Sequence, residues 1–229
     1  MAHPSMATLP TLREGDRLDA EEFLRRWEAM PELKHAELID GVVFMASPVL
    51  LSHGDPHAEV VYWLKSYVEG TMGCHSALEV TWVMGGKNVP QPDGFLRILP
   101  EYGGQSGRTE KGYGRGAPEL IVEVTGSSLS RDLKKKLELY QSAGVREYIT
   151  VLVNSEKVVW RRLVRGQFKE LAADNDGLLR SRTFPGLWLD PDAVFSKGKS
   201  IRAAVELGLQ SPEHAAFVKK LAAAHAKRK

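Results

Sequence analysis

One apolar segment constrains the fold more than any other part of the sequence. Residues 120–124 read Leu-Ile-Val-Glu-Val, so a continuous apolar run contains a single carboxylate, Glu123. A strand with one face in water alternates apolar and polar residues, whereas an uninterrupted run is typical of a strand covered on both faces. The chain must therefore provide helices for both faces of a sheet, which predicts a mixed α/β fold.

The rest of the chain supplies both helices and strands. Helical spacing and capping residues predict a helix after Asp19 that Pro31 ends, a helix opened by Asp55 and Pro56 that runs to Val68, a helix from Leu129 to the capping Gly144, and tail helices after Ser200 and Ser211. Alternation and turn residues predict a hairpin over 37–45 around Asp40 and Gly41, and strands over 78–84, 95–98, 120–124, 148–153, 158–163 and 168–171. The predicted fold is a mixed sheet flanked by helices.

Residues 101–116 interrupt this pattern. They contain glycines at 103, 104, 107, 112, 114 and 116 among polar residues. Such a composition predicts a mobile loop, either a simple insertion or a lid over a site. The loop does not have the Gly-Lys-Ser or Gly-Lys-Thr spacing of a phosphate-binding loop.

The composition fits one folded domain with extensions. The chain has 229 residues, of which 43% are hydrophobic and 26% charged, which is enough for one substantial core. We expect a disordered leader over 1–15, a single α/β domain over 16–195 and a helical appendix over 196–229. The lone Cys74 excludes an intrachain disulfide and favours a reducing compartment, so the expected location is the cytoplasm. No apolar stretch is long enough to span a bilayer, so no membrane partner is expected.

The charge balance limits how this protein can meet nucleic acid. Its 31 basic and 29 acidic side chains leave a formal charge of +2, so no strong overall field attracts a polyanion. Contacts with nucleic acid must come from local basic patches, although most such runs are solvated faces. The candidates are Arg131 with Lys134, Lys135 and Lys136; Arg161, Arg162 and Arg165; and Lys219, Lys220, Lys227, Arg228 and Lys229.

Two carboxylates are candidates for chemistry. Glu123 lies in a strand predicted to be buried, where a carboxylate needs either a basic partner or a metal ion. Asp93 follows Pro92 and precedes Gly94, a sequence that is also common in ordinary turns. A second acidic residue upstream of Glu123 favours the metal site over a simple salt bridge.

Read in order, these residues resemble the Uma-two family of putative restriction endonucleases, a branch of the PD-(D/E)xK nuclease superfamily. The matching residues extend in order over 36–187 and include Ala36–Gly41, Met45–Pro48, His53, Pro92-Asp93, Glu123-Val124, Asp132–Lys136, Tyr140, Gly144–Tyr148 and Phe184–Leu187. The resemblance implies a restriction-endonuclease-like core and assigns Asp93 and Glu123 as the metal ligands.

The superfamily lysine is displaced in this chain. It is expected two residues after Glu123, where Thr125 stands, and the resemblance moves its role to Lys136 on the next helix. A helix beside the strand can direct a long ammonium side chain toward the carboxylates. The alternative is a surface pair between Lys136 and Asp132, which is an auxiliary residue of the predicted site.

Glu37 and His53 are further auxiliary candidates. Glu37 matches a family glutamate and would complete the oxygen shell of the cation, directly or through water; a salt bridge near the hairpin is an equal alternative. His53 and His57 have the spacing of zinc ligands, but Pro56 interrupts the register and no third ligand lies nearby in sequence. We therefore reject zinc and expect His53 to make at most a backbone contact.

The function that the resemblance implies is hydrolysis of phosphodiester bonds. A hard divalent ion held by carboxylates activates water and stabilises charge on a phosphate, so the expected cofactor is Mg²⁺, with Mn²⁺ as a substitute. The expected substrate is duplex DNA and the expected assembly a homodimer. The alternatives are a non-catalytic nuclease-fold module that binds DNA or a protein partner, and a nuclease that acts on RNA.

Overall fold

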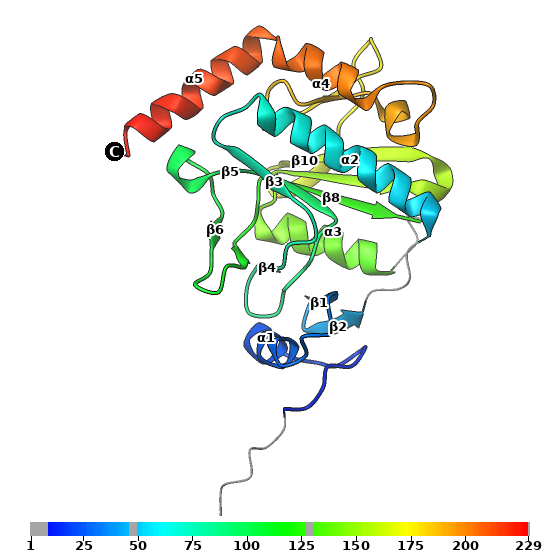
Figure 1. The fold of residues 1–229 in the computed structure, drawn as a ribbon, viewed down its shortest axis with the longest axis vertical. Helices are drawn as coiled ribbons and strands as arrows, with labels where there is room; N and C mark the ends of the chain where they lie inside the picture. Colours follow the sequence, from blue (N-terminus) through cyan, green and yellow to red (C-terminus); the bar gives the residue numbers. More distant parts are fainter. Residues whose placement is uncertain (1–8, 46–49, 127–130, 229) are drawn as a thin grey trace, which may run out of the picture.

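The computed structural model describes residues 9–45, 50–126 and 131–228, and for Arg131 and Asp132 it describes the backbone alone. A six-stranded mixed sheet forms its centre (Figure 1). From one edge to the other, the strands are β11 (Gln167–Glu170), β10 (Lys157–Val164), β9 (Glu147–Leu152), β8 (Leu120–Thr125), β5 (Gly94–Ile98) and β3 (Cys74–Ala77). The pair β8–β9 is parallel, and the other neighbours are antiparallel.

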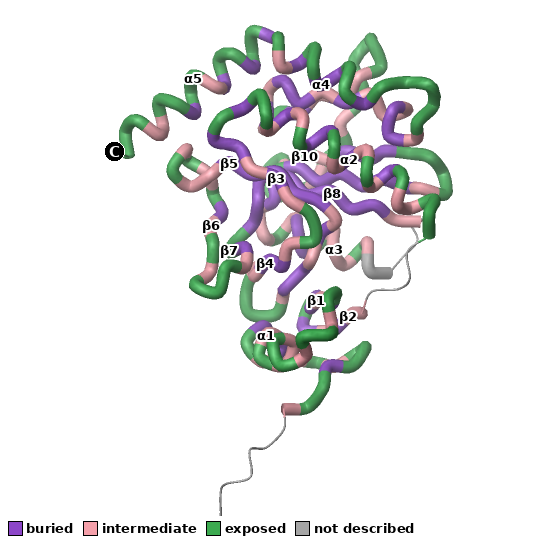
Figure 2. The backbone as a smooth tube through the Cα atoms, in the orientation of Figure 1, coloured by how far each residue is buried: buried purple, intermediate pink, exposed green. Residues whose placement is uncertain are grey.

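Helices cover both faces of this sheet, as the apolar run in β8 predicts. In Figure 1, α2 (Leu51–Glu69) lies above the strands and α3 (Arg131–Ala143) lies below them. On the α2 face, Trp63 and Leu64 pack in one core cluster with Val122 and Ile149. Figure 2 shows the central strands as the most continuously buried part of the backbone. The predicted fold class, a mixed sheet flanked by helices, is confirmed.

The two C-terminal helices share the main core. The helices α4 (Ile201–Leu209) and α5 (Pro212–Ala226) follow a short 3₁₀ segment, η3 (Pro191–Phe195). Val205 of α4 and Phe217 of α5 are buried in the cluster that contains the α2 side chains. The two helices after residue 196 therefore contribute to the core of the fold. In the part of the chain that the structure describes, no helix is long and apolar enough to cross a membrane.

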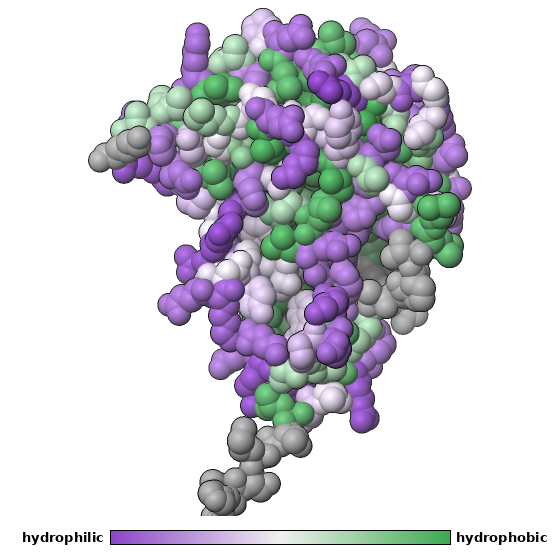
Figure 3. Space-filling view, viewed as in Figure 1, coloured by the Kyte–Doolittle hydropathy of each residue, from purple (hydrophilic) through white to green (hydrophobic). Residues whose placement is uncertain are grey.

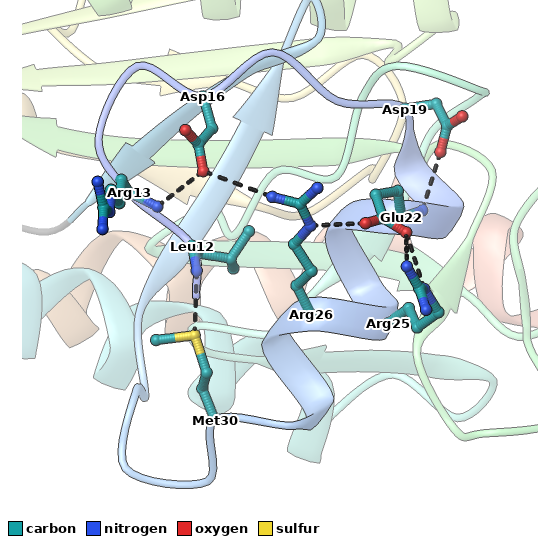
Figure 4. Close-up of polar contacts among 8 residues, drawn as sticks. All are labelled: Leu12, Arg13, Asp16, Asp19, Glu22, Arg25, Arg26 and Met30. Carbon is teal, nitrogen blue, oxygen red and sulfur yellow. Dashed lines mark hydrogen bonds and ion pairs between the residues drawn. The ribbon is translucent and has the colours of Figure 1, made fainter. Parts of the chain in front are cut away.

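The N-terminal unit packs around a hairpin. It consists of α1 (Ala20–Glu28), β1 (Ala36–Ile39) and β2 (Val42–Met45). Asp19 caps α1 by accepting a hydrogen bond from the Glu22 backbone N at 2.8 Å, as predicted (Figure 4). Leu12, inside the leader predicted over 1–15, is buried, and its backbone N approaches the Met30 sulfur at 3.2 Å (Figure 4). The folded part thus begins before residue 16.

Two local predictions are wrong. The helix α2 begins at Leu51 rather than at Asp55, and Pro56 lies inside it, where its missing N–H removes one hydrogen bond near the start of the helix. The strand predicted over 78–84 is reduced to β4 (Trp82–Val83), and Leu78 is exposed. The edge strand β3 comes earlier, in a segment too polar to show a clear alternation.

The predicted mobile loop over 101–116 is also wrong, because this segment has its own secondary structure. It contains η1 (Pro100–Tyr102), β6 (Gly107–Arg108) and β7 (Gly114–Arg115), and the two strands join β4 in a small sheet. A Cβ at Gly114 would lie 2.4 Å from the Trp82 ring, so this glycine permits close packing rather than mobility. Outside these regions, a two-stranded pair joins β12 (Leu179–Arg180) to β13 (Trp188–Leu189), and η2 (Val153–Ser155) connects β9 to β10.

Candidate active site

The two predicted metal ligands face each other across neighbouring strands. Gly94 of β5 pairs with Val122 of β8, and this register continued by one residue places Asp93 opposite Glu123. The Asp93 carboxylate accepts a hydrogen bond from the Val124 backbone N at 2.6 Å. The structure thus brings together two carboxylates that lie 30 residues apart in sequence.

The Pro92-Asp93-Gly94 sequence leads into a strand rather than forming a turn. The Pro92 carbonyl accepts a hydrogen bond from the Glu79 backbone N at 3.2 Å, and β5 begins at Gly94. A Cβ at Gly94 would lie 3.4 Å from the Leu64 side chain, so α2 passes close to this strand. Asp93 therefore lies at the start of β5, with its side chain on the face opposite α2 and hydrogen-bonded to β8.

Glu123 is almost fully enclosed and has two polar partners from α3. The Lys136 Nζ lies 3.1 Å from Oε1 and 3.0 Å from Oε2, and the Tyr140 hydroxyl donates to Oε1 at 2.6 Å. Burial raises the pKa of Glu123 above its usual value; Lys136 opposes this shift, while Asp93 and Glu37 add to it. The net effect is a raised pKa, so the Glu123 carboxyl takes up a proton more readily than an exposed glutamate does.

Lys136 joins Glu123 to a third carboxylate. Its Nζ lies 2.9 Å from Oε2 of Glu37, whose other oxygen accepts a hydrogen bond from the Gln91 backbone N at 2.7 Å. Burial lowers the pKa of Lys136, but Glu123 and Glu37 together raise it above its usual value. The ammonium group thus remains charged between two acidic side chains from β1 and β8, and the Lys136 side chain is 12% exposed.

The three consecutive lysines of α3 point in different directions, as helical geometry requires. Lys136 faces the carboxylates, and Lys134 is exposed. Lys135 is half-buried, with its Nζ 5.0 Å from the centre of the Phe44 ring. Lys135 therefore packs against the hairpin strand β2, which lies beside this part of α3.

The remaining predicted residues are less central. Glu37, in the hairpin strand β1, forms a salt bridge with Lys136, which was the alternative to a place in the oxygen shell of a cation. His57, not His53, approaches the site, with its Nε2 3.1 Å from the Asp93 carbonyl oxygen. Both histidines lie on the continuous helix α2, and their ring centres are 6.4 Å apart. The side chain of Asp132 lies outside the described residues, so its proposed pairing with Lys136 stays a prediction.

Sequence reasoning missed the role of Tyr140. It was identifiable as an inner-face residue of its helix, and it lies four residues after Lys136, which places both side chains on one side of α3. The sequence could not show that the hydroxyl would reach Glu123, because that contact depends on how α3 lies across β8. Tyr140 is therefore a positioning residue for the Glu123 carboxylate.

Comparing two neighbouring tyrosines tests this contact. Tyr140→Phe removes a donor from the buried Glu123, and we expect the free energy of unfolding to fall by about 1–3 kcal/mol. Tyr148, whose ring centre is 5.2 Å from that of Tyr140, has a buried hydroxyl with no hydrogen-bond partner among the described residues. Tyr148→Phe should therefore leave the stability nearly unchanged. Urea denaturation of both variants measures the difference, and equal losses would contradict a specific contact between Tyr140 and Glu123.

The donor chemistry of the site fits Mg²⁺. Asp93 and Glu123 supply hard carboxylate oxygens from adjacent strands, and Mg²⁺ commonly takes one or two protein carboxylates and completes its shell with water and substrate phosphate. Over the described residues, no group of three or more His, Cys, Asp or Glu side chains is arranged to hold a metal ion.

Comparison with solved structures identifies the class of fold. The chain is similar to a crystal structure, at 1.96 Å resolution, of a putative nuclease belonging to DUF820 from Anabaena variabilis ATCC 29413. The match has a TM-score of 0.55 at 16% sequence identity, and it covers 81% of this chain and 98% of that chain. The chain thus shares the fold of that protein.

The family follows from the sequence itself. The chain belongs to the Uma2 family, described as "Putative restriction endonuclease", whose model matches residues 20–192. A search of curated proteins found no match. The resemblance to this family in the sequence is confirmed, and the matched region contains Asp93, Glu123 and Lys136.

Proposed function

We propose that this protein is a metal-dependent endonuclease that hydrolyses phosphodiester bonds in DNA. The observation that carries the proposal is the position of Asp93 and Glu123 on adjacent strands, with the Lys136 ammonium 3.0 Å from Glu123. Family membership and the nuclease-like fold support the same class of reaction. The proposal thus has three parts: hydrolysis of phosphodiester bonds, dependence on a metal ion, and DNA as the substrate.

Each side chain of the site has a distinct role in this proposal. Asp93 and Glu123 would hold Mg²⁺, or Mn²⁺ as a substitute, and the bound ion would activate water and polarise the phosphate. Lys136 stabilises negative charge that develops on the phosphate or orients the attacking water. Glu37 and Tyr140 hold Lys136 and Glu123 in position through the contacts at 2.9 and 2.6 Å.

Duplex DNA is the proposed substrate because of the family description. The formal charge of +2 provides no strong overall attraction, and on the face shown in Figure 3 hydrophilic side chains are interspersed with small apolar groups. Binding must then depend on local basic side chains near the site. An RNA nuclease or a non-catalytic module with the same fold would use similar local contacts.

A cleavage panel tests the proposed function. Purified protein is incubated with duplex DNA, single-stranded DNA and RNA, each with Mg²⁺, with Mn²⁺ or with a chelator. We expect cleavage of duplex DNA with either metal and none with the chelator. Faster cleavage of RNA would change the substrate, and binding of DNA without cleavage under any condition would identify a non-catalytic module.

We further propose that the protein acts as a homodimer in the cytoplasm. Nucleases that cut both strands of a duplex commonly place one site on each strand, and the free, buried Cys74 is compatible with a reducing compartment. Sedimentation velocity should give a mass twice the 25.4 kDa of one chain. A species of single-chain mass at all concentrations would exclude the dimer.

A further inference from the structure

The proposed site continues across the sheet beyond Glu123. On the α3 face, Asp93 lies opposite Glu123, and Glu123 pairs in register with Thr150 of β9. Adjacent strands lie about 4.8 Å apart, so these positions form a short row across three strands. Thr150, the third residue of this row, is buried and places a hydroxyl beside the two carboxylates.

Arg161 of β10 reaches back into this row. It pairs in register with Tyr148, whose ring packs on the α3 face of the sheet, and its Nη1 donates to the Thr150 Oγ1 at 3.1 Å. The side chain is half-buried, so its guanidinium lies between the protein interior and the solvent. The Arg161 side chain therefore extends from β10 across β9 toward β8, the strand of Glu123, and the Thr150 hydroxyl holds it there.

Arg161 forms no ion pair with any carboxylate of the described residues. Among the residues that the structure describes, no Asp or Glu lies within ion-pair distance of its guanidinium. Glu170, its cross-strand neighbour on β11, is exposed and forms no such pair with it. A fixed guanidinium with free N–H groups presents a forked donor suited to a phosphate.

A second polar group beside Arg161 also has no partner. The Tyr148 hydroxyl is buried without a hydrogen bond among the described residues, although buried polar groups nearly always have one. Its position on the same face as Thr150 and Arg161 gives this part of the sheet an additional unused donor. The half-buried Arg161 guanidinium, which is fixed by Thr150 and forms no ion pair among the described residues, therefore points to an absent anionic ligand.

We propose that Arg161, held by Thr150, binds a backbone phosphate of the nucleic acid next to the phosphate that is cleaved. The inference rests on the proposed function and assigns one of its substrate contacts. It also distinguishes between the neighbouring arginines of the basic run Arg161, Arg162 and Arg165, which the sequence alone treats as one patch. Arg162 is the next residue on β10, so it points to the opposite face, and it is exposed.

Binding measurements in a variant that does not cleave test the inference. In an Asp93→Asn background, the affinity for a short DNA duplex is measured by fluorescence anisotropy over a series of salt concentrations. We expect Arg161→Gln to weaken binding about tenfold or more and to reduce the slope of log affinity against log salt by about 1. The matched control Arg162→Gln should change neither quantity, and Arg161→Lys should recover part of the affinity.

The possible outcomes separate this inference from the proposed function. Equal affinities and slopes for Arg161→Gln and Arg162→Gln would overturn the inference, even if the wild-type protein cleaves DNA. A loss of affinity that is matched by a lower melting temperature in Arg161→Gln would also overturn it, because Arg161 would then be structural. A specific effect of Arg161→Gln in a protein that never cleaves would support the phosphate contact and reject the catalytic proposal.

Discussion

Lys136→Met is expected to reduce cleavage of DNA by about 10²–10³-fold or more, as the loss of a positioned charge at a reacting phosphate does. Methionine retains the length and apolar stem of lysine, so the substitution removes mainly the ammonium group. The measurement is the single-turnover rate constant at saturating enzyme, which separates the chemical step from binding.

The same substitution should also destabilise the metal-free protein. The helical register alone predicts that Lys136 can be lost with little change in melting temperature, but its ammonium lies within 3.0 Å of both Glu123 and Glu37. Removing one partner of a buried pair costs about 3–5 kcal/mol, less whatever is recovered when Glu123 takes up a proton. Added Mg²⁺ should restore part of the melting temperature, because a bound cation would again balance the carboxylates.

Two neighbouring lysines provide the controls. Lys134→Met changes an exposed side chain on the same helix and should leave both the rate constant and the melting temperature nearly unchanged. Lys135→Met removes only the contact with the Phe44 ring, which is worth about 0.5–1 kcal/mol at a partly exposed site. If all three variants lost activity equally, Lys136 would have no special role and the catalytic lysine would lie elsewhere.

The parts of the fold that the sequence predicted are those with a local physical cause. The buried strand around Glu123 is evident from its apolar run, and the turn at Asp40 and Gly41 is evident because both residues tolerate the positive φ values of 50° and 74° that it requires. The helix α3 was recognisable from its apolar stripe and from Gly144, which has a φ of 83° after its last turn. These features depend on residues close together in sequence.

The errors arose where distant packing decides the local structure. The start of α2 at Leu51 overrides the preference of Pro56 for a first turn, since the helix can lose one hydrogen bond near its end. The glycine-rich loop becomes ordered because Gly114 allows its backbone to approach Trp82. Neither the early start of α2 nor the contact between Gly114 and Trp82 can be predicted from the residues adjacent in sequence.

The candidate site shows the same division. The resemblance selected Asp93, Glu123 and Lys136, and the structure brings them together through the register of β5 with β8 and the position of α3. The contact from Tyr140 and the direction of Arg161 depend on how helix and strands lie in space, so the sequence alone could not assign them. Contacts between side chains of different helices and strands are thus the hardest features of the site to predict from the sequence.

The second large effect is expected for Asp93→Asn, which should abolish detectable cleavage and weaken Mg²⁺ binding while the protein remains folded. Asparagine has the same shape, and its Oδ1 can still accept the hydrogen bond that the Val124 N–H donates to Asp93 at 2.6 Å. It lacks the negative charge that a hard divalent cation requires from a ligand. The substitution therefore separates the hydrogen bond that Asp93 accepts from β8 from its proposed role as a metal ligand.

Asp40→Asn makes the same chemical change at an exposed turn residue and is the matched control. Isothermal titration with Mg²⁺ and circular dichroism of wild type, Asp93→Asn and Asp40→Asn give the binding and folding measurements, and the cleavage rate is measured in parallel. Wild-type Mg²⁺ affinity in Asp93→Asn would exclude this residue as a ligand. Cleavage that continues in chelator would exclude metal-dependent hydrolysis altogether, because the two carboxylates and the ammonium would then perform the reaction without the proposed ion.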